Sequence, residues 1–549
     1  TLVLLSVYGK NLFGTRLGFD GEFEATKVVS ELLTPISTRK LEANERDLPF
    51  YAEAAPAKFL EIIERDLRAK KSEVKGLLRP ANPGLFGSCP RSGLLWALEG
   101  LAWNPTTFSR VVRILGELSE IEIDVNWVNK PIESLKSIFR VWMPQTAADH
   151  EMRLKAVNML LDKYPKVGWT VCLQQFGNPG RQVGDYNHKP KWRPDGSGFG
   201  EPIQKREPIL TFVREIVRLA LDRPSYTVEM LCDLVARLHA LVPEDQARVW
   251  EIINKWHRSG VGEEEVAQLR DKIRVTFLTR WAHKRFNGPE QAAMLEKAKA
   301  VYAELQTKDS RNKYEWLFRA GWIDLQEGEF DGDEMDFRIR EQRLQKLQID
   351  ALRNIVQEQG IPGVLRFSEK GNFQRIIGAY LGACILVDEQ IDDLILQCLR
   401  LTENHSGRDE IIAGVFGALD KGRRAFVYER LRDKVSEEEM IRLMLLSPYR
   451  AFIWKLVDQL SAMARTRYWL EVVPKFIFDS PEENNESILR LLKVGRPRAA
   501  FVSMHFEIEK IPLSLLAQML FAMAGKSQEK EGEYLLDGYD VRRAFKLLD

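Results

Sequence analysis

Residues 94–119, LLWALEGLAWNPTTFSRVVRILGELS, carry the clearest structural signal in this sequence. Apolar residues in their second half recur at i, i+3, i+4, i+7 and i+10, which is one face of an α-helix: Phe108, Val111, Val112, Leu115 and Leu118. Asn104-Pro105 stands just before them, and asparagine followed by proline is a typical helix start. These residues therefore predict a helix that begins after Asn104.

The same 3.6-residue periodicity continues through most of the chain. Further apolar stripes fall within residues 154–161, 209–220, 231–238, 249–256 and 344–356, the last one ending at Gly360, a natural left-handed helix stop. Thr146-Ala-Ala-Asp149 has the form of a capping box. Alternating patterns are nearly absent, and we expect short strands only at Leu2–Val7 and Phe501–Ile508. The prediction is an all-α, irregular α-solenoid of antiparallel helix pairs, a degenerate relative of tetratricopeptide or HEAT repeats without a fixed period.

A chain of 549 residues is too long for one compact core, which stops growing at about 250–300 residues. Residues 177–208 interrupt the helical pattern with some thirty residues rich in Gly and Pro. We therefore divide the chain into an N-terminal helical segment 1–176, the loop insertion 177–208, a middle helical segment 209–360 and a C-terminal helical segment 361–549. The chain begins without Met, and we expect it to be a piece of a longer protein.

Composition limits the class of protein. Lys and Arg number 80 against 79 Asp and Glu, whereas a general nucleic-acid or membrane-surface binder is normally basic. The five cysteines are widely spaced and form no C-x-x-C, which favours a reducing, cytoplasmic setting. No apolar run reaches the 18–20 residues or so that span a bilayer. We expect a cytoplasmic protein with no membrane contact.

Motifs for catalysis are missing. Ala524-Gly525-Lys526-Ser527 ends like a phosphate-binding loop but lacks the first glycine, because position 520 is Leu520. The acidic turn at 331–336 lacks the ligand spacing of a calcium loop, and the histidines are scattered. We expect no enzymatic activity, no cofactor and no metal site in this chain.

The loop insertion holds the candidate binding residues. It mixes cations with aromatic side chains, which suits stacking or contact with an anionic surface: Arg181, Tyr186, His188, Lys189, Lys191, Trp192 and Arg193. The structural alternative is that Trp192 plugs the solenoid and Arg193 caps helix carbonyls, so that the loop only tethers itself. Trp96 and Trp103, seven residues apart on one helix face, are both expected in the core.

Several segments also resemble a known family. They are LLWALEGLAWNP, NWVNKPIESLKSIF, KVGWTVCL, KPKWRP and, further on, YEWLFRAGW at 314–322. Together they resemble the C-terminal helical half of large bacterial proteins that couple a STAND-type NTPase and an N-terminal effector to anti-phage defence (AVAST-like systems). The resemblance covers about residues 40–400. It implies a sensor that recognises a phage component while the NTPase oligomerises to activate the effector. The Walker motifs are not in this chain, so no active-site residue is carried over.

The sequence thus predicts a non-catalytic recognition and scaffold module of a bacterial anti-phage defence protein. Its expected partner is a phage protein, or the NTPase and effector domains of its own protein, with oligomerisation on activation. The alternative is a nucleic-acid-binding or nuclease-type helical protein whose active site is not visible in the sequence.

Overall fold

The computed structural model describes residues 1–15, 19–79, 89–123, 129–141, 144–176, 188–193, 206–279, 282, 289–319, 323, 325, 337–369, 371–400, 405–525, 527–529 and 533–548. Within these ranges every regular element is a helix, so the fold is all-α. The chain forms two compact units, unit 1 from Thr1 to Gln306 and unit 2 from Thr307 to Asp549. Each unit has its own apolar core. In the described part of the chain, each helix is too short or too polar to cross a lipid bilayer.

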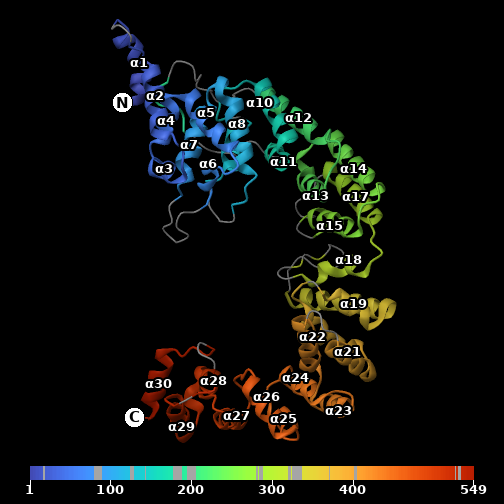
Figure 1. The fold of residues 1–549 in the computed structure, drawn as a ribbon. Coiled ribbons are helices and arrows are strands. Elements are labelled where there is room, and N and C mark those ends of the chain that lie inside the picture. Colours follow the sequence, from blue (N-terminus) through green and yellow to red (C-terminus); the bar gives the residue numbers. More distant parts are fainter. Residues whose placement is uncertain are drawn as a thin grey trace. The chain divides into compact units, whose positions relative to one another are not determined.

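Unit 1 is a stack of helices joined mostly by short links (Figure 1). Its helices are α1 (Leu2–Phe13), α2 (Gly21–Leu33), α3 (Thr38–Ala43), α4 (Leu48–Ala54), α5 (Pro56–Leu67), α6 (Glu73–Gly76), α7 (Arg91–Ala102), α8 (Pro105–Ser119), α9 (Pro131–Ile138), α10 (His150–Lys163), α11 (Pro165–Gln174), α12 (Arg206–Leu221), α13 (Val228–Arg237), α14 (Pro243–Arg258), α15 (Glu263–Ile273) and α17 (Pro289–Glu304).

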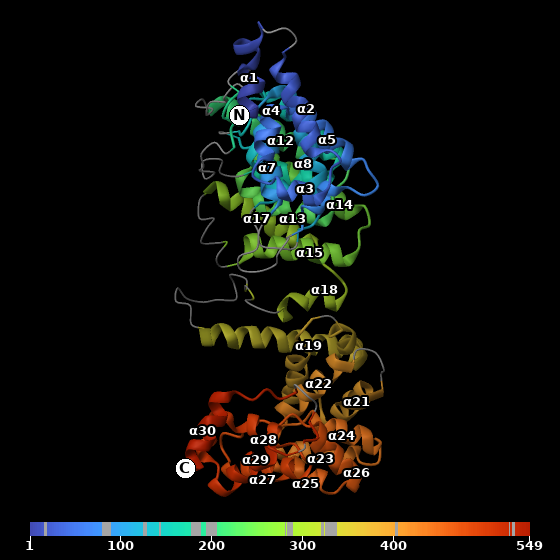
Figure 2. The ribbon, with the colours of Figure 1, turned by 60° about the vertical axis from the view of Figure 1, so that its left-hand side comes forward.

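Unit 2 continues the same construction. It contains α18 (Ser310–Tyr314), α19 (Phe337–Phe367), α20 (Gln374–Tyr380), α21 (Asp388–Arg400), α22 (His405–Ala418), α23 (Lys421–Leu431), α24 (Glu437–Leu445), α25 (Ala451–Val457), α26 (Ala462–Glu471), α27 (Pro481–Lys493), α28 (Pro497–Met504), α29 (Leu513–Met523) and α30 (Gly538–Leu548), with a 3₁₀ turn at His505–Lys510. The longest of these is α19, seen from the side in Figure 2.

The sequence signals at 94–119 are confirmed. The residues form α7 and α8, and Asn104 caps α8 by accepting a hydrogen bond from the Thr106 N–H at 2.9 Å. The predicted stripe is fully buried from Phe108 to Leu118. The stop at Gly360 is also confirmed, because its φ of 64° breaks the helical run of α19. Together these elements make the all-α, irregular α-solenoid that the periodicity predicts.

Three local predictions are wrong. Leu2–Val7 is the first half of α1, and Phe501–Ile508 is divided between α28 and the 3₁₀ turn after it. Short apolar runs do not distinguish a strand from a buried helix, and packing against neighbouring helices decides. The helix cap predicted at Thr146 is Asp149, which accepts from the Met152 N–H, while the Thr146 hydroxyl donates to the Ala102 carbonyl instead.

The boundary between the two units lies after Gln306, inside the predicted middle segment 209–360. The reason is visible in the cores: the unit 1 core ends at Leu305 and the unit 2 core begins at Leu317. Helix α12 begins at Arg206, slightly before the predicted end of the loop insertion at 208.

The ion pairs of unit 2 recur at similar separations along the sequence. Arginines pair with carboxylates 29 to 38 residues away, close to the length of a helix–turn–helix repeat. Several of these pairs join a helix to the second helix along the chain, for example α21 to α23 and α22 to α24. The pairs are Arg375–Glu410, Arg423–Asp388, Arg430–Asp392, Arg442–Asp409, Arg450–Asp479, Arg467–Glu438, Arg490–Asp458 and Arg543–Glu509. Most of these ion pairs therefore connect successive helix pairs of the solenoid.

In unit 1 a single carboxylate joins α5 to α8. Glu64 accepts hydrogen bonds from Arg110 at 2.8 and 3.1 Å and from Arg113 at 2.6 Å. The Arg110 bond is the main reason that the pKa of Glu64 is lowered from its ordinary value of 4.5. A lowered folded-state pKa means that this stabilisation is complete above pH 4.5 and is lost as pH falls through the folded value.

Glu64→Gln is therefore expected to reduce the stability of unit 1 at pH 7 by about 1.5–3 kcal/mol, the usual range for hydrogen bonds to charged groups. The variant is also expected to lose less stability than the wild type between pH 5 and about pH 3. Thermal denaturation at both pH values checks this expectation. Equal acid sensitivity in the two proteins would show that Glu64 is not a source of the pH dependence.

Candidate partner-binding site

Residues 188–193 of the loop insertion form a strap that lies against α1, α2, α4 and α7 of unit 1. The strap contains five of the seven candidate binding residues: His188, Lys189, Lys191, Trp192 and Arg193. Arg181 and Tyr186 lie outside the described residues. The structure therefore brings the second half of the predicted site onto the surface of the N-terminal helices.

The first anchor of the strap is His188. Its Nδ1 pairs with the carboxylate of Glu99 on α7, and its ring stacks on the indole of Trp96 with centroids 4.9 Å apart and planes inclined by 18°. The backbone of His188 has φ = 49°, in the left-handed region where histidine is uncommon. Such a conformation persists only where surrounding contacts hold it. Here Glu99 and Trp96 supply those contacts.

The second anchor is Lys189, whose ammonium lies 4.8 Å from the ring centroid of Trp103. Consecutive strap residues therefore cover Trp96 and Trp103, which places both indoles on the same side of α7, as the seven-residue spacing predicts. Only Trp103 is buried, however. Trp96 is 39 % exposed, so its assignment to the core is wrong. The His188 ring of the strap stacks on this indole.

The third anchor is Glu53 in the last turn of α4. One of its carboxylate oxygens accepts the backbone N–H groups of Trp192 and Arg193, the latter at 3.1 Å. In return the Arg193 Nε donates to the main-chain carbonyl of Glu53 at 2.7 Å, and an Nη donates to the Ser6 hydroxyl at 3.2 Å. Carbonyls of a last helical turn lack helical partners, so an arginine is well placed to satisfy one.

Arg193 thus adopts the capping role of the structural alternative. Trp192 does not behave as that alternative predicts, because its side chain is 43 % exposed and does not fill the solenoid. Contacts of His188, Lys189 and Arg193 hold the backbone of the strap in place. The side chains of Lys191 and Trp192 are exposed. Its role in binding a partner stays a prediction.

Beneath the strap lies a cavity of about 300 Å³, which we call the strap pocket. Its walls are mainly apolar and come from α4, the start of α5, α7 and the strap: Phe50, Pro56, Trp96, Ala97, Leu101 and Pro190. The volume is at the lower end of the range of small-molecule and side-chain pockets. The strap pocket therefore has the size and lining of an anchor site.

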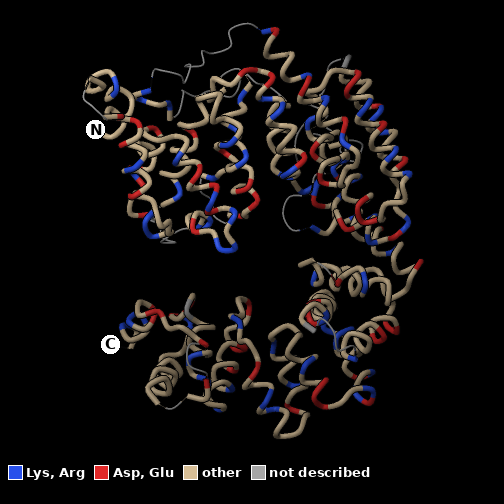
Figure 3. Tube along the Cα trace, turned by 45° about the horizontal axis from the view of Figure 1, so that its top comes forward, with Lys and Arg blue, Asp and Glu red and all other residues tan. Residues whose placement is uncertain are grey.

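The rim of the strap pocket is positively charged. Arg46 and Lys191 line it, and neither side chain forms an ion pair or hydrogen bond within the described residues. The two nearby carboxylates, Glu53 and Glu99, are occupied by the strap itself. Elsewhere acidic and basic residues are interspersed along the helices of both units (Figure 3). The pocket therefore has two exposed cations without a hydrogen bond or ion pair, in a chain whose net charge is only +1.

Other chemistry in the described residues is limited. No group of three or more His, Cys, Asp and Glu side chains there has the arrangement of a metal site. Burial raises the pKa of the Cys172 and Cys398 thiols to about 12, so neither is a thiolate at neutral pH. The acidic turn at 331–336 lies outside the described residues.

Sequence reasoning missed Arg46, Phe50, Glu53, Trp96 and Glu99 as members of the site. Glu53 precedes Arg193 by 140 residues and Glu99 precedes His188 by 89, so no local pattern connects them. A weak signal exists in Trp96, which is a large aromatic residue followed by small ones, Ala97 and Gly100, on the same helix. Small residues there make room for the cavity.

Comparisons with known proteins add little. No protein-family model matches the chain, and no curated protein matches it. One matching solved structure is described as a circular tandem repeat protein with novel repeat topology and enhanced subunit contact surfaces. The match covers 96 % of this chain and 94 % of the other at 12 % identity, with a TM-score of 0.14. Because this TM-score is so low, the functional assignment depends on the chain's own residues.

Proposed function

We propose that this chain is a non-catalytic recognition and scaffold module of a cytoplasmic bacterial anti-phage defence protein. It binds a phage protein, or other domains of its own protein, through the helical solenoid and the strap, and it oligomerises on activation. The resemblance of residues 40–400 to STAND-type defence proteins supports the biological setting. The all-α solenoid supports a scaffold, because each helix pair buries its apolar stripe against its neighbours and leaves a surface for contact.

One observation carries the assignment of the binding surface to the strap. His188, Lys189 and Arg193 fix the strap from below, so Lys191 and Trp192 are presented from a rigid backbone next to an open apolar pocket. Interfaces gain most of their affinity from a few Trp, Tyr and Arg anchors that are already held in place. A loop that only tethered itself would not need to leave Trp192 exposed and the pocket empty of side chains.

The test is the double variant Trp192→Ala/Arg193→Ala. The tagged chain is captured from phage-infected and uninfected bacteria, and phage-encoded proteins are quantified by mass spectrometry. We expect a phage protein to be enriched on the wild type and reduced at least tenfold on the variant, while circular dichroism of the two chains stays the same. Binding of the purified pair then confirms direct contact.

The matched control is Phe426→Ala/Arg432→Ala, which removes an exposed aromatic residue and an exposed arginine from unit 2. This control is expected to retain the phage protein. If the strap variant retains the same phage protein, the strap is not part of the binding surface. Absence of any phage protein on the wild type would contradict recognition of a phage protein and leave only binding to other domains of its own protein.

A further inference from the structure

We infer that the strap pocket receives one bulky apolar side chain, aromatic or long aliphatic, from a partner segment whose flanking residues are acidic. This inference rests on the proposed function and names the chemistry of the partner at the site. It follows from three properties of the strap pocket: its apolar walls, the hydrogen bonds that its neutral polar groups already make, and the positive charge of its rim.

The walls select an apolar group. Phe50 and Trp96 are each about two-fifths exposed, and Pro56 and Pro190 complete the lining. Filling the pocket removes this apolar surface from water, which favours binding. A volume of about 300 Å³ accommodates a single large side chain together with the backbone that carries it. Such central anchors are the usual sites of high binding energy in interfaces.

Two neutral polar groups of the pocket are already engaged within the chain. The Thr107 hydroxyl donates to the Leu101 carbonyl at 2.6 Å. The Asn104 side-chain oxygen accepts from the Thr106 N–H and hydroxyl, both at 2.9 Å. These bonds close the start of α8, so the hydroxyl and the amide oxygen are already engaged there. Apart from the cations on the lining, the pocket therefore offers few partners for the donors and acceptors of a nucleobase, which favours an apolar group.

The rim selects negative charge beside the anchor. Arg46, just before α4, and Lys191, in the strap, are exposed cations on the lining of the same cavity, and Arg46 also interacts electrostatically with the adjacent Glu45. Glu53 and Glu99 do not neutralise them, because strap groups already occupy both carboxylates. Carboxylates one or two residues from the anchor side chain would pair with these cations. Basic flanking residues would meet uncompensated like charge.

The experiment uses labelled pentapeptides and fluorescence anisotropy with the full chain. The probes are acetyl-Asp-Glu-Phe-Glu-Asp-amide, its central leucine, tryptophan and alanine versions, and acetyl-Lys-Lys-Phe-Lys-Lys-amide. We expect the acidic peptides with a bulky centre to bind at least tenfold more tightly than both the alanine version and the lysine version. Raising the salt concentration is expected to weaken this binding. N-acetylphenylalanine, AMP and a thymidine oligonucleotide serve as competitors and are expected to displace the peptide poorly.

Two variants localise the binding. Ala97→Phe places a ring inside the strap pocket and is expected to abolish peptide binding. Arg46→Glu/Lys191→Glu changes only exposed rim charges, so it tests the idea even where the filled variant folds poorly. This second variant is expected to reverse the preference toward the lysine peptide. Glu251→Lys/Glu304→Lys, on α14 and α17, is a control whose charge change has the same size and the opposite sign, and it is expected to leave the preference unaltered.

The inference is overturned if no peptide of the set discriminates the wild type from Arg46→Glu/Lys191→Glu. It is also overturned if N-acetylphenylalanine or a nucleotide competes as well as the unlabelled peptide. These outcomes are distinct from failure of the proposed function. Capture of a phage protein that depends on Trp192 and Arg193 would stand even if the acidic peptides did not bind.

Discussion

Gly414→Ala is expected to destabilise unit 2 by about 3 kcal/mol, although alanine is the best helix former and glycine one of the worst. A Cβ at this position of α22 would lie 2.1 Å from the Arg375 carbonyl oxygen and 2.8 Å from the Ala379 nitrogen of α20. The close approach is reciprocal, since a Cβ on Gly378 of α20 would lie 2.0 Å from the Ile411 carbonyl oxygen. Both obstacles are backbone atoms, so α20 and α22 must separate. Overpacking of this kind costs about 1–3 kcal/mol and occasionally more.

Gly417→Ala, one turn further along α22, is the matched control. Nothing lies within 4 Å of a Cβ placed there. Only the helix preference remains, and we expect stabilisation of up to about 1 kcal/mol. Hydrogen exchange of the α20 and α22 amides measures both changes in the full chain, and it reports local opening without assuming that the two units unfold together. Destabilisation of similar size by both variants would contradict the assignment of Gly414 to a close helix contact.

The fold class was predictable because it depends on a local signal. A stripe such as Phe108 to Leu118 repeats every 3.6 residues wherever a helix buries one face, and Asn104 marks the helix start by its own chemistry. The repeat length was not predictable in the same way. In unit 2 the repeat is visible in ion pairs between an arginine on one helix and a carboxylate on the second helix along the chain. The two residues of a pair are 29 to 38 positions apart in the sequence. Variable spacing leaves no consensus to find.

The candidate site was predictable in part. The strap is rich in cations and aromatic side chains, and this composition alone predicts a binding role for its residues: His188, Lys189, Lys191, Trp192 and Arg193. The strap pocket was not predictable. Its walls come from α4 and α7 and from the strap, which are far apart in the sequence, so no local pattern brings them together. Trp96 shows the limit most clearly: the seven-residue spacing placed it correctly on the face of Trp103, yet what covers that face is determined by a distant segment.

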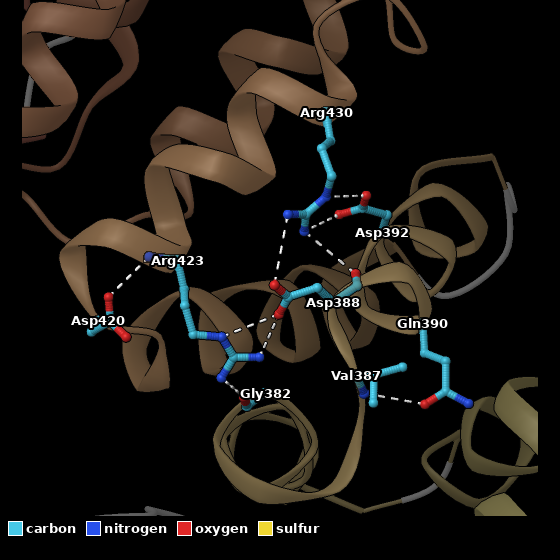
Figure 4. Close-up of polar contacts among 8 residues, drawn as sticks. All are labelled: Gly382, Val387, Asp388, Gln390, Asp392, Asp420, Arg423 and Arg430. Carbon is cyan, nitrogen blue, oxygen red and sulfur yellow. Dashed lines mark hydrogen bonds and ion pairs between the residues drawn. The ribbon is translucent and has the colours of Figure 1, made fainter.

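The second large effect concerns the hub of ion pairs between α21 and α23 (Figure 4). Arg430 donates to the two carboxylate oxygens of Asp392 at 2.6 and 2.9 Å, and it also lies 3.8 Å from the Asp388 carboxylate. Arg423 donates to Asp388 at 2.7 and 3.2 Å and is the first cause of the lowered pKa of that carboxyl. The Asp392 side chain is only 7 % exposed, against 31 % for Arg430. The buried member of this pair is therefore the carboxylate.

Arg430→Met is expected to destabilise unit 2 by about 2–3 kcal/mol, because it leaves the Asp392 carboxylate buried without its cation. Arg430→Met/Asp392→Leu removes both charges, and we expect this double variant to recover most of the lost stability, since an apolar pair of similar volume often equals a buried ion pair. Asp392→Leu alone leaves Arg430 with Asp388 and partial exposure, so its effect is expected to be below about 1 kcal/mol. Hydrogen exchange of α21 and α23 in the four proteins gives the coupling energy. If the loss of stability in the double variant equals the sum of the two single losses, the two residues are not coupled. Asp392 would then find another partner when Arg430 is removed, and this ion pair would not be what connects the two helix pairs.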